Sequence, residues 1–427
     1  MPPVDQKPFI LAVQWILRVK VLGQLSGSKN QNSQVYCKTL TDVEKGIYVE
    51  DWSISSEEVD AGEGWKIEKR RLHGGVSDGI DIITVDNGNL SFIVVPTRGM
   101  GIWKGECRGI SLGWDSPVKC LVHPRHVNLE SRGGLGWLDG FNEWIVRCGI
   151  ASFGAPGFDV LRDNQGREMK VMLTLHGKIA NIPASVVKVK IGLKPPFEIG
   201  VEGVVYETSM FGSNLKLSTS ITTVPGSNTL KISDIIENLR SFPDETQLLY
   251  HCNFGSPFLE KGARLVAPIK RVAPRDSVAA KGIDAFNVFG APETGFVEQV
   301  YFMDLFSDNE DRTRTMLVNR DATKAVSVSF SKKNLPCFTL WKNTVAKEDG
   351  YVAGLEPGTS FPNPKRFERE KGRVKVLKPG EKFQAEVALS VHLGEDEVAK
   401  AVKKVEAIRG ERGSTVYEKP IPEFSLV

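Results

Sequence analysis

The sequence predicts a mainly β protein, a large antiparallel β-sandwich with few helices. Apolar and polar residues alternate along many short segments, which is the pattern of half-buried strands. Phe197, Ile199 and Val201, for example, fall on one face of an expected strand, and the polar or small residues between them fall on the other. Strand, turn and strand follow one another without long helical spacers, which excludes a doubly wound α/β sheet.

Turn residues separate the expected strands. The alternation resumes at residues 215–221 after Gly-Ser-Asn at 212–214, and Pro-Gly-Ser-Asn at 225–228 predicts the turn before the next strand. Near the C-terminus, residues 374–377 and 383–393 flank a Pro-Gly turn, and we interpret them as a hairpin.

One helix is expected close to the C-terminus. Its apolar stripe at helical spacing consists of Val398, Val402, Val405 and Ile408. Acidic residues at 395–397 suit the start of this helix, and Gly410 can cap its end.

Three parts of the chain are expected: an N-terminal extension and polar tether over residues 1–45, a sandwich domain over 46–398, and a C-terminal helix and tail over 399–427. The tether is placed at residues 23–33, which are rich in polar residues, glycine and serine. An apolar run at residues 9–17 lacks the charge order of a secretory signal and is shorter than the roughly 20 residues that span a bilayer. We expect it to pack as a strand or helix.

Charge and cysteine usage limit the partners and the compartment. The 55 basic and 52 acidic residues give a net charge of +3 with no long run of one sign, so a phosphate-binding surface is not indicated. The six cysteines lie far apart and never as Cys-x-x-Cys, which predicts free thiols in a reducing compartment. We therefore expect a cytoplasmic protein with neither nucleic acid nor membrane as a partner.

Three short segments carry the candidate chemistry. They are Leu175-His176-Gly177, Tyr250-His251-Cys252-Asn253-Phe254-Gly255 and Gly354-Leu355-Glu356-Pro357. Imidazole titrates close to neutral pH, and a glutamate in a partly dry pocket can be tuned toward it, so such groups suit proton transfer. A lone histidine after a strand is often a core or surface residue. Both histidines, however, share an expected position where a strand leaves the sheet, which favours a functional role.

Cys120, His123 and His126 form the only spacing that suggests a metal. A strand would place His123 on the face opposite the other two, and Pro124 opposes a helix, so only a loop could bring all three together. We expect no metal site and no cofactor.

The order and spacing of the three segments, with Leu-Glu-Pro ahead of Phe361-Pro362-Asn363, resemble those of aldose 1-epimerases, or galactose mutarotases, over about residues 70–393. The resemblance implies a galactose mutarotase-like sandwich and an isomerase that interconverts the anomers of a sugar by acid/base ring opening. It assigns the general acid to His251, the general base to Glu356, and a sugar-holding role to His176.

The same resemblance adds residues that bind the sugar. Glu298 approximately matches a hydroxyl-binding carboxylate, and Asn253 lies at the pocket wall. An arginine ahead of the first histidine is expected, and Arg98 and Arg147 are both candidates, although either can instead form a structural ion pair. Trp341 is the best candidate for an aromatic platform, whereas a tryptophan taken alone is more often a core residue.

Two other functions remain open. The chain can be a non-catalytic carbohydrate-binding or regulatory protein that kept the pocket, or a lyase or hydrolase on the same sandwich. An acid, a base and a further histidine count against pure binding. Departures from the family pattern around the catalytic residues make ordinary galactose or glucose a less expected substrate.

Overall fold

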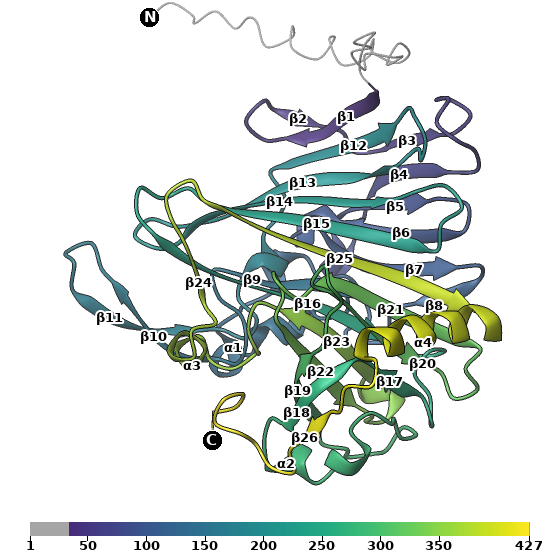
Figure 1. Cartoon of the computed structure of the whole chain (residues 1–427). Helices are drawn as coiled ribbons and strands as arrows, with labels where there is room; N and C mark the ends of the chain where they lie inside the picture. The colour runs from purple at the N-terminus through teal and green to yellow at the C-terminus, as the bar shows by residue number, and fades with distance from the viewer. Residues whose placement is uncertain (1–33, 427) are drawn as a thin grey trace, which may run out of the picture.

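The structure, a computed structural model, describes residues 34–426 (Figure 1). Two large sheets and a few short helices make up this part of the chain, so the predicted mainly β sandwich is confirmed. The predictions for residues 9–17 and 23–33 lie outside the described residues.

One sheet has ten strands. In spatial order they are β17 (Arg264–Val266), β20 (Arg312–Val318), β21 (Lys324–Ser331), β25 (Lys382–Leu393), β15 (Thr229–Asn238), β14 (Asn214–Thr223), β13 (Ile199–Thr208), β12 (Val186–Gly192), β1 (Val35–Asp42) and β2 (Ile47–Tyr48). The predicted alternation is confirmed in β14, where Leu215, Leu217 and Ile221 are fully buried.

The other sheet has fourteen strands. Along its main path they are β26 (Thr415–Val416), β18 (Ile269–Pro274), β19 (Gln299–Leu305), β22 (Cys337–Asn343), β23 (Val352–Gly358), β16 (Asp244–Phe254), β9 (Ile145–Ile150), β7 (Gly101–Cys107), β6 (Leu90–Val95), β5 (Asp81–Asp86), β4 (Lys66–Arg71) and β3 (Trp52–Ser55), with β24 (Lys375–Leu377) beside β16 and β8 (Ile110–Leu112) beside β7.

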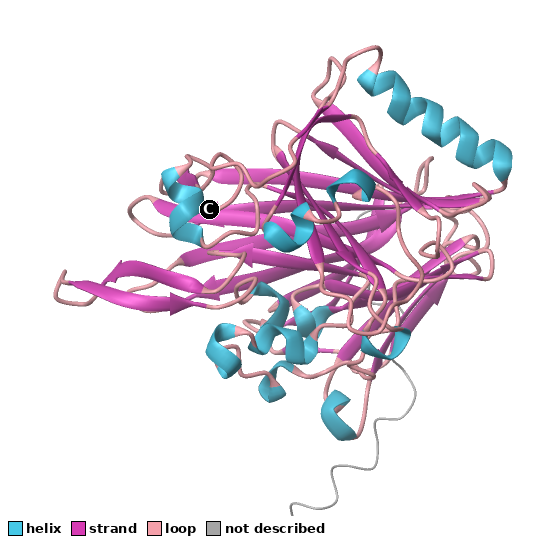
Figure 2. Cartoon of the chain, turned by 90° about the horizontal axis from the view of Figure 1, so that it is seen from below, coloured by secondary structure: helices cyan, strands magenta, loops and turns pink. Residues whose placement is uncertain are grey.

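Helices and one arm lie outside these sheets. The arm is the hairpin β10 (Gly157–Arg162) and β11 (Glu168–Leu173), which projects from the body (Figures 1 and 2). The α-helices are α1 (Ser131–Gly134), α2 (Ser277–Ala280), α3 (Lys365–Glu370) and α4 (Glu395–Arg409). The 3-10 turns are η1 (Gly75–Ser77), η2 (Pro96–Arg98), η3 (Pro124–His126), η4 (Gly136–Gly140), η5 (Ile179–Asn181), η6 (Ile283–Ala285) and η7 (Lys347–Asp349).

Helix α4 confirms the predicted C-terminal helix. It buries Val398, Ala401 and Val405 against Met316 and Val318 of β20. No helix within residues 34–426 has both the length and the apolarity needed to cross a membrane.

The main core fills the space between the two sheets. Val201 and Ile221 from the ten-stranded sheet join one buried cluster with Val85, Ile102 and Tyr250 from the fourteen-stranded sheet. Successive residues of a strand point to opposite faces, so the residues that alternate with these point away from the core.

Two details of the sequence prediction differ from the structure. The expected hairpin of residues 374–377 and 383–393 is wrong, because β24 pairs with β16 of one sheet while β25 pairs with β15 and β21 of the other. The ten-stranded sheet also begins at Val35, where β1 pairs with β12, which is earlier than the expected domain start at residue 46. Apolar alternation identifies a strand but does not identify its partner.

A buried ion pair joins the two sheets. Arg147 of β9 donates from Nε to Asp234 Oδ2 of β15 at 2.5 Å and from Nη2 to Oδ1 at 2.9 Å. Tyr250 of β16 donates to the same carboxylate at 2.8 Å, and Thr219 accepts from Arg147 at 2.6 Å. Each charged group therefore has several partners in a place without water, which is what a buried ion pair requires.

We expect Arg147→Met to lower the free energy of unfolding by about 3–5 kcal/mol, because it leaves the Asp234 carboxylate buried without its cation. Urea denaturation measures the loss. Lys190→Met is the matched control: Lys190 pairs with Glu202 on the exposed face of a strand pair, and its loss should cost below about 1 kcal/mol. Equal losses for the two variants would contradict a special role for the buried pair.

Candidate active site

Three neighbouring strands bring the candidate groups to one face of the fourteen-stranded sheet. Strand β23 pairs with β16 so that Leu355 is opposite Cys252, and with β22 so that Glu356 is opposite Thr339. The same register places Glu356 opposite His251. We call Thr339, Glu356 and His251 the first row, because they lie side by side across the three strands.

A second row lies two residues along the same strands and therefore on the same face. It consists of Trp341, Gly354 and Asn253, again in cross-strand register. A side chain at Gly354 would collide with Glu356 Oε1 and press on the Trp341 ring. The glycine of the Gly-Leu-Glu segment therefore provides the space that the Glu356 carboxylate occupies.

The position of His251 corrects one prediction. His251 lies inside β16, before its last residue Phe254, and not where a strand leaves the sheet. His176 does follow a strand, since it lies in the turn between β11 and η5 with a left-handed backbone φ of 56°. Its ring nevertheless approaches that of His251, with ring centroids 5.5 Å apart.

A cavity of about 220 Å³ lies over the two rows. Its polar lining consists of His176, His251, Arg275, Glu298, Thr339 and Glu356. Its aromatic lining consists of Trp137, Phe141 and Trp341. Pockets for drug-sized ligands measure about 300–1,000 Å³, so this cavity suits a single small ring.

Several polar atoms in the cavity wall are buried and lack a partner. In the described part of the chain, no hydrogen bond reaches Trp137 Nε1, His176 Nδ1 or Thr339 Oγ1, and Glu356 Oε1 has only its 3.2 Å contact with His251 Nε2. Buried polar atoms are nearly always paired in folded proteins, and a polar ligand in this cavity would satisfy these four atoms.

His251 and Glu356 form the central pair. His251 Nε2 lies 3.2 Å from Glu356 Oε1, and both side chains are almost fully buried. Burial lowers the pKa of His251 to about 4, although the hydrogen bond that His251 donates to Asn253 opposes this. Burial also raises the pKa of Glu356 well above its ordinary value, and the nearby Glu298 carboxylate adds to this. Burial therefore disfavours the charged form of both groups.

Asn253 determines which nitrogen of His251 carries a proton. Its amide nitrogen donates to the backbone oxygens of Glu143, at 3.0 Å, and His251, at 3.3 Å. Its amide oxygen therefore faces His251 Nδ1 at 2.6 Å and accepts a hydrogen bond from it. The lone pair of the neutral ring is then on Nε2, toward Glu356. Asn253 is not among the residues that line the cavity, and its side chain is bonded to the His251 ring and to backbone oxygens.

Glu298 and Trp341 lie together at the cavity. Trp341 Nε1 donates to Glu298 Oε2 at 2.7 Å, and Arg275 Nη2 donates to Glu298 Oε1 at 3.1 Å. Arg275 also donates from Nε to Asp276 Oδ2 at 2.9 Å. The Trp341 ring lies 5.3 Å from the His251 ring, in an edge-on arrangement.

Neither predicted arginine lines the cavity. Arg147 neighbours Tyr250 in the sheet register and therefore points into the core toward Asp234, away from His251. Arg98 is buried in an ion pair with Glu143, with Nε 2.6 Å from Oε1, and also donates to Asn181. Each of the two arginines therefore forms a structural ion pair, which is the second of the two roles that the sequence allowed. The arginine that lines the cavity is Arg275.

Sequence reasoning missed several lining residues for identifiable reasons. Thr339 could have been found, because it lies two positions before Trp341 and so shares its face of the strand. The Trp137 ring packs edge-on against the His176 ring, with ring centroids 4.7 Å apart. The sequence does not indicate which way a tryptophan in a glycine-rich segment points. Phe141 and Arg275 reach the cavity from loops, and no motif marks them.

The suggested metal spacing does not form a cluster. Across the described residues, no three His, Cys, Asp or Glu side chains gather in a metal-binding group. His123 Nδ1 instead accepts from the backbone of Arg125, whose side chain donates to His126.

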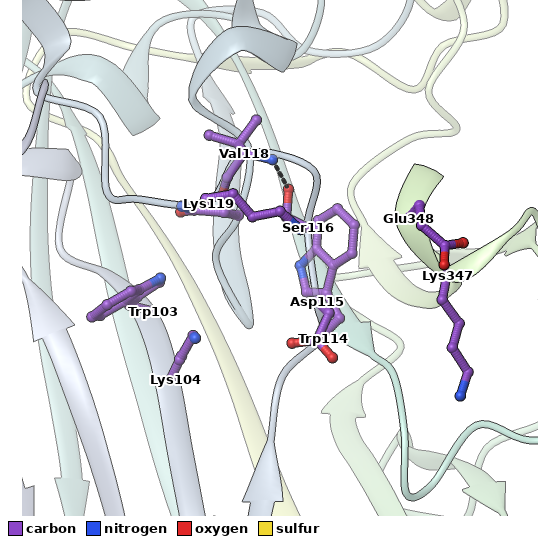
Figure 3. Close-up of a pocket in the computed structure, with 10 residues that line it drawn as sticks. Trp103, Lys104, Trp114, Asp115, Ser116, Val118, Lys119, Lys347 and Glu348 are labelled. Atoms are coloured by element: carbon purple, nitrogen blue, oxygen red, sulfur yellow. Dashed lines mark hydrogen bonds between the residues drawn. The ribbon is translucent and has the colours of Figure 1, made fainter.

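A second hollow, of about 340 Å³, lies beyond Trp114 (Figure 3). Trp103 and Lys104 lie on one side of it and Lys347 and Glu348 on the other. Trp114 lines this hollow and packs against Phe141, which lines the first cavity. The lining of the second hollow contains no histidine and no buried carboxylate, whereas His251 and Glu356 both line the first cavity.

A family model described as "Domain of unknown function (DUF4432)" matches residues 77–391. The chain belongs to the DUF4432 family. No curated protein matches it in sequence.

Solved structures place the DUF4432 chain among galactose mutarotase-like proteins. A Klebsiella pneumoniae subsp. pneumoniae MGH 78578 protein described as a "putative aldose 1-epimerase" is 37% identical, with a TM-score of 0.85 over 91% of this chain and 99% of that chain. A "galactose mutarotase-like protein" from Clostridium acetobutylicum is 17% identical, with a TM-score of 0.52 over 77% of this chain and 98% of that chain, which shows the fold alone.

We predict that His251 is neutral at pH 6.5 and carries its proton on Nδ1. NMR of protein labelled with 15N-histidine tests this, because the chain has only six histidines. Asn253→Ala, which removes the acceptor, should increase the fraction of the tautomer protonated on Nε2. A wild-type ring protonated on Nε2, or charged at pH 6.5, would contradict the geometry.

Proposed function

We propose that this protein is an aldose 1-epimerase-like isomerase that interconverts the anomers of a sugar by acid/base ring opening. The observation that carries the proposal is the contact between His251 and Glu356, 3.2 Å apart at the wall of a small cavity with unpartnered polar atoms. The 37% identity to the Klebsiella protein over nearly the whole chain supports the same class.

The proposed reaction moves two protons in opposite directions. His251 donates a proton from Nε2 to the ring oxygen while Glu356 takes the proton of the anomeric hydroxyl. The bond between the ring oxygen and the anomeric carbon breaks, and a carbonyl forms. Rotation about the neighbouring carbon–carbon bond and the reverse proton transfers then close the ring as the other anomer.

In this proposal a proton passes from Glu356 to His251 before this step, because burial favours the neutral carboxyl and the neutral imidazole. Nε2 and Oε1 are close enough for direct transfer, and the Nδ1–H held by Asn253 leaves Nε2 free to receive it. Sugar hydroxyls supply hydrogen bonds that stabilise the resulting carboxylate and imidazolium. The ligand thus produces the charged acid/base forms that burial alone disfavours.

The remaining groups hold the sugar in this proposal. His176 Nδ1 and Thr339 Oγ1 bind hydroxyls near the reacting pair, Glu298 binds one at the far side, and the Trp341 ring lies beside the sugar. Aromatic rings pack against the apolar C–H faces of sugars, while the polar groups fix orientation.

A reducing compartment such as the cytoplasm is part of the proposal. All six cysteines lie in the described residues and none forms a disulfide, and four of them are buried. Free thiols of this kind are the rule in reducing compartments.

We expect His251→Ala and Glu356→Gln each to slow anomer exchange by about 10²–10⁴-fold, because each removes one partner of the proton transfer. NMR magnetisation transfer or polarimetry with a sugar that wild type turns over measures the rate.

His392→Ala and Glu202→Gln serve as controls, since His392 bonds to Ser327 and Glu202 to Lys190, away from the cavity. Both should keep near wild-type rates. Wild-type rates in folded His251→Ala and Glu356→Gln would refute the mechanism.

In the pH dependence of kcat/KM, we expect the acid limb to lie at a lower pH than an ordinary histidine would give. Below the His251 pKa of about 4, both groups of the pair are protonated and no base remains, so kcat/KM should fall only as the pH approaches 4. Activity should also fall at high pH once Glu356, whose pKa is raised, loses the shared proton. A pH–rate profile of kcat/KM measures both limbs. An acid limb centred near 6.5, the pKa of an ordinary histidine, would contradict this assignment.

A further inference from the structure

Most of the cavity wall is apolar. Nine of the fifteen lining residues are apolar, so hydrogen-bonding groups cover only the smaller part of any bound ring. Leu135 and Leu138 line the cavity from the segment around η4, and Pro362 lines it from another loop. Val300 of β19 neighbours Trp341 in the sheet register and extends the second row with an aliphatic side chain.

The polar groups are concentrated in few places. The first row and His176 supply partners for the ring oxygen, the anomeric hydroxyl and the hydroxyls nearest to them. Common hexoses carry an oxygen on every carbon. A hydroxyl against Leu135 or Val300 would lose its water without gaining a protein partner, which is unfavourable, whereas Leu138 is exposed at the rim.

The cavity lining also has no basic side chain that is free to bind an anionic group. Arg275 is the only Lys or Arg side chain among the lining residues, and it is bound by both Asp276 and Glu298. With the Glu356 carboxyl beside them, acidic groups outnumber the single arginine. A phosphate or carboxylate on the substrate would therefore be buried among acids without a free partner.

We propose that the substrate is an uncharged deoxy sugar, that is, a monosaccharide with a hydrogen where its common parent carries a hydroxyl, and that the deoxy carbon contacts the aliphatic part of the cavity wall, to which Leu135 and Val300 contribute. This inference rests on the proposed function, which it narrows from sugars in general to one chemical class.

Matched pairs of sugars test the inference. Anomer exchange is measured for D-galactose and 6-deoxy-D-galactose, for D-glucose with its 2-deoxy and 6-deoxy forms, and for D-ribose and 2-deoxy-D-ribose. We expect at least one deoxy sugar to exceed its parent about tenfold in kcat/KM, since one unpaired buried hydroxyl has an effect of this order. Parents that equal or exceed every deoxy form would overturn the inference.

A variant with a hydroxyl in the wall provides the reciprocal test. Val300→Thr is nearly isosteric and places a hydrogen-bonding group in the aliphatic wall, so it should shift the preference toward the parent sugar about tenfold or less. Val297→Thr, on an exposed residue outside the cavity, is the control and should leave the preference unchanged. An unchanged preference in folded Val300→Thr would show that the deoxy carbon does not contact this wall.

Charged sugars test the second half of the inference. D-glucuronate and D-glucose 6-phosphate should be exchanged at least about tenfold more slowly than the best neutral sugar, and comparable rates would overturn the claim of an uncharged substrate.

Binding separates this inference from the proposed function. Thermal shift of the Glu356→Gln variant, which cannot complete the reaction, ranks the same sugars without turnover. Tighter binding of deoxy sugars without anomer exchange by the wild-type protein would refute the proposed isomerase and support the deoxy-sugar ligand. Anomer exchange with a preference for parent or charged sugars would support the isomerase and refute the deoxy-sugar ligand.

Discussion

The pairing register of β16, β23 and β22 is the constraint on which the candidate site depends. Directly opposed residues on neighbouring antiparallel strands have Cβ atoms about 4.5–5.5 Å apart, and only one register puts His251, Glu356 and Thr339 side by side. A slip of one residue would turn every side chain to the opposite face. That slip is opposed by the core, because Tyr250 and Leu355 on the other face are fully buried between the sheets.

The same alternation explains what the sequence could predict. The motifs His-x-Asn and Gly-x-Glu are pairs of residues that share one face of a strand, so their spacing of two already carries the geometry. The two arginines could not be assigned from sequence, because whether an arginine meets a ligand or a carboxylate depends on groups distant in the chain. For Arg147 that group is Asp234, on a strand of the other sheet. Strand partners were equally hidden, as the separation of β24 from β25 demonstrates.

Burial shapes the chemistry of the central pair as much as proximity does. In water an imidazole and a carboxyl with ordinary pKa values would sit together as an ion pair near pH 6. Inside the cavity, loss of water lowers the pKa of His251 and raises that of Glu356, so burial favours the neutral form of each group. In the proposed ring opening the charged arrangement lies one proton transfer away, across the 3.2 Å between His251 Nε2 and Glu356 Oε1, and hydrogen bonds from the sugar would stabilise it.

Stability and specificity are carried by different parts of this architecture. The two rows lie on central strands of a fourteen-stranded sheet, which hold side chains more precisely than loops do. The walls that would contact the rest of a ligand come mainly from connecting segments, with Leu135, Trp137 and Phe141 between β8 and β9 and Pro362 after β23. Loops tolerate substitution better than sheet interiors do. The register that places His251 and Glu356 makes no demand on the residues that cover them, so under the proposed function relatives can share this pair and differ in the sugar they accept.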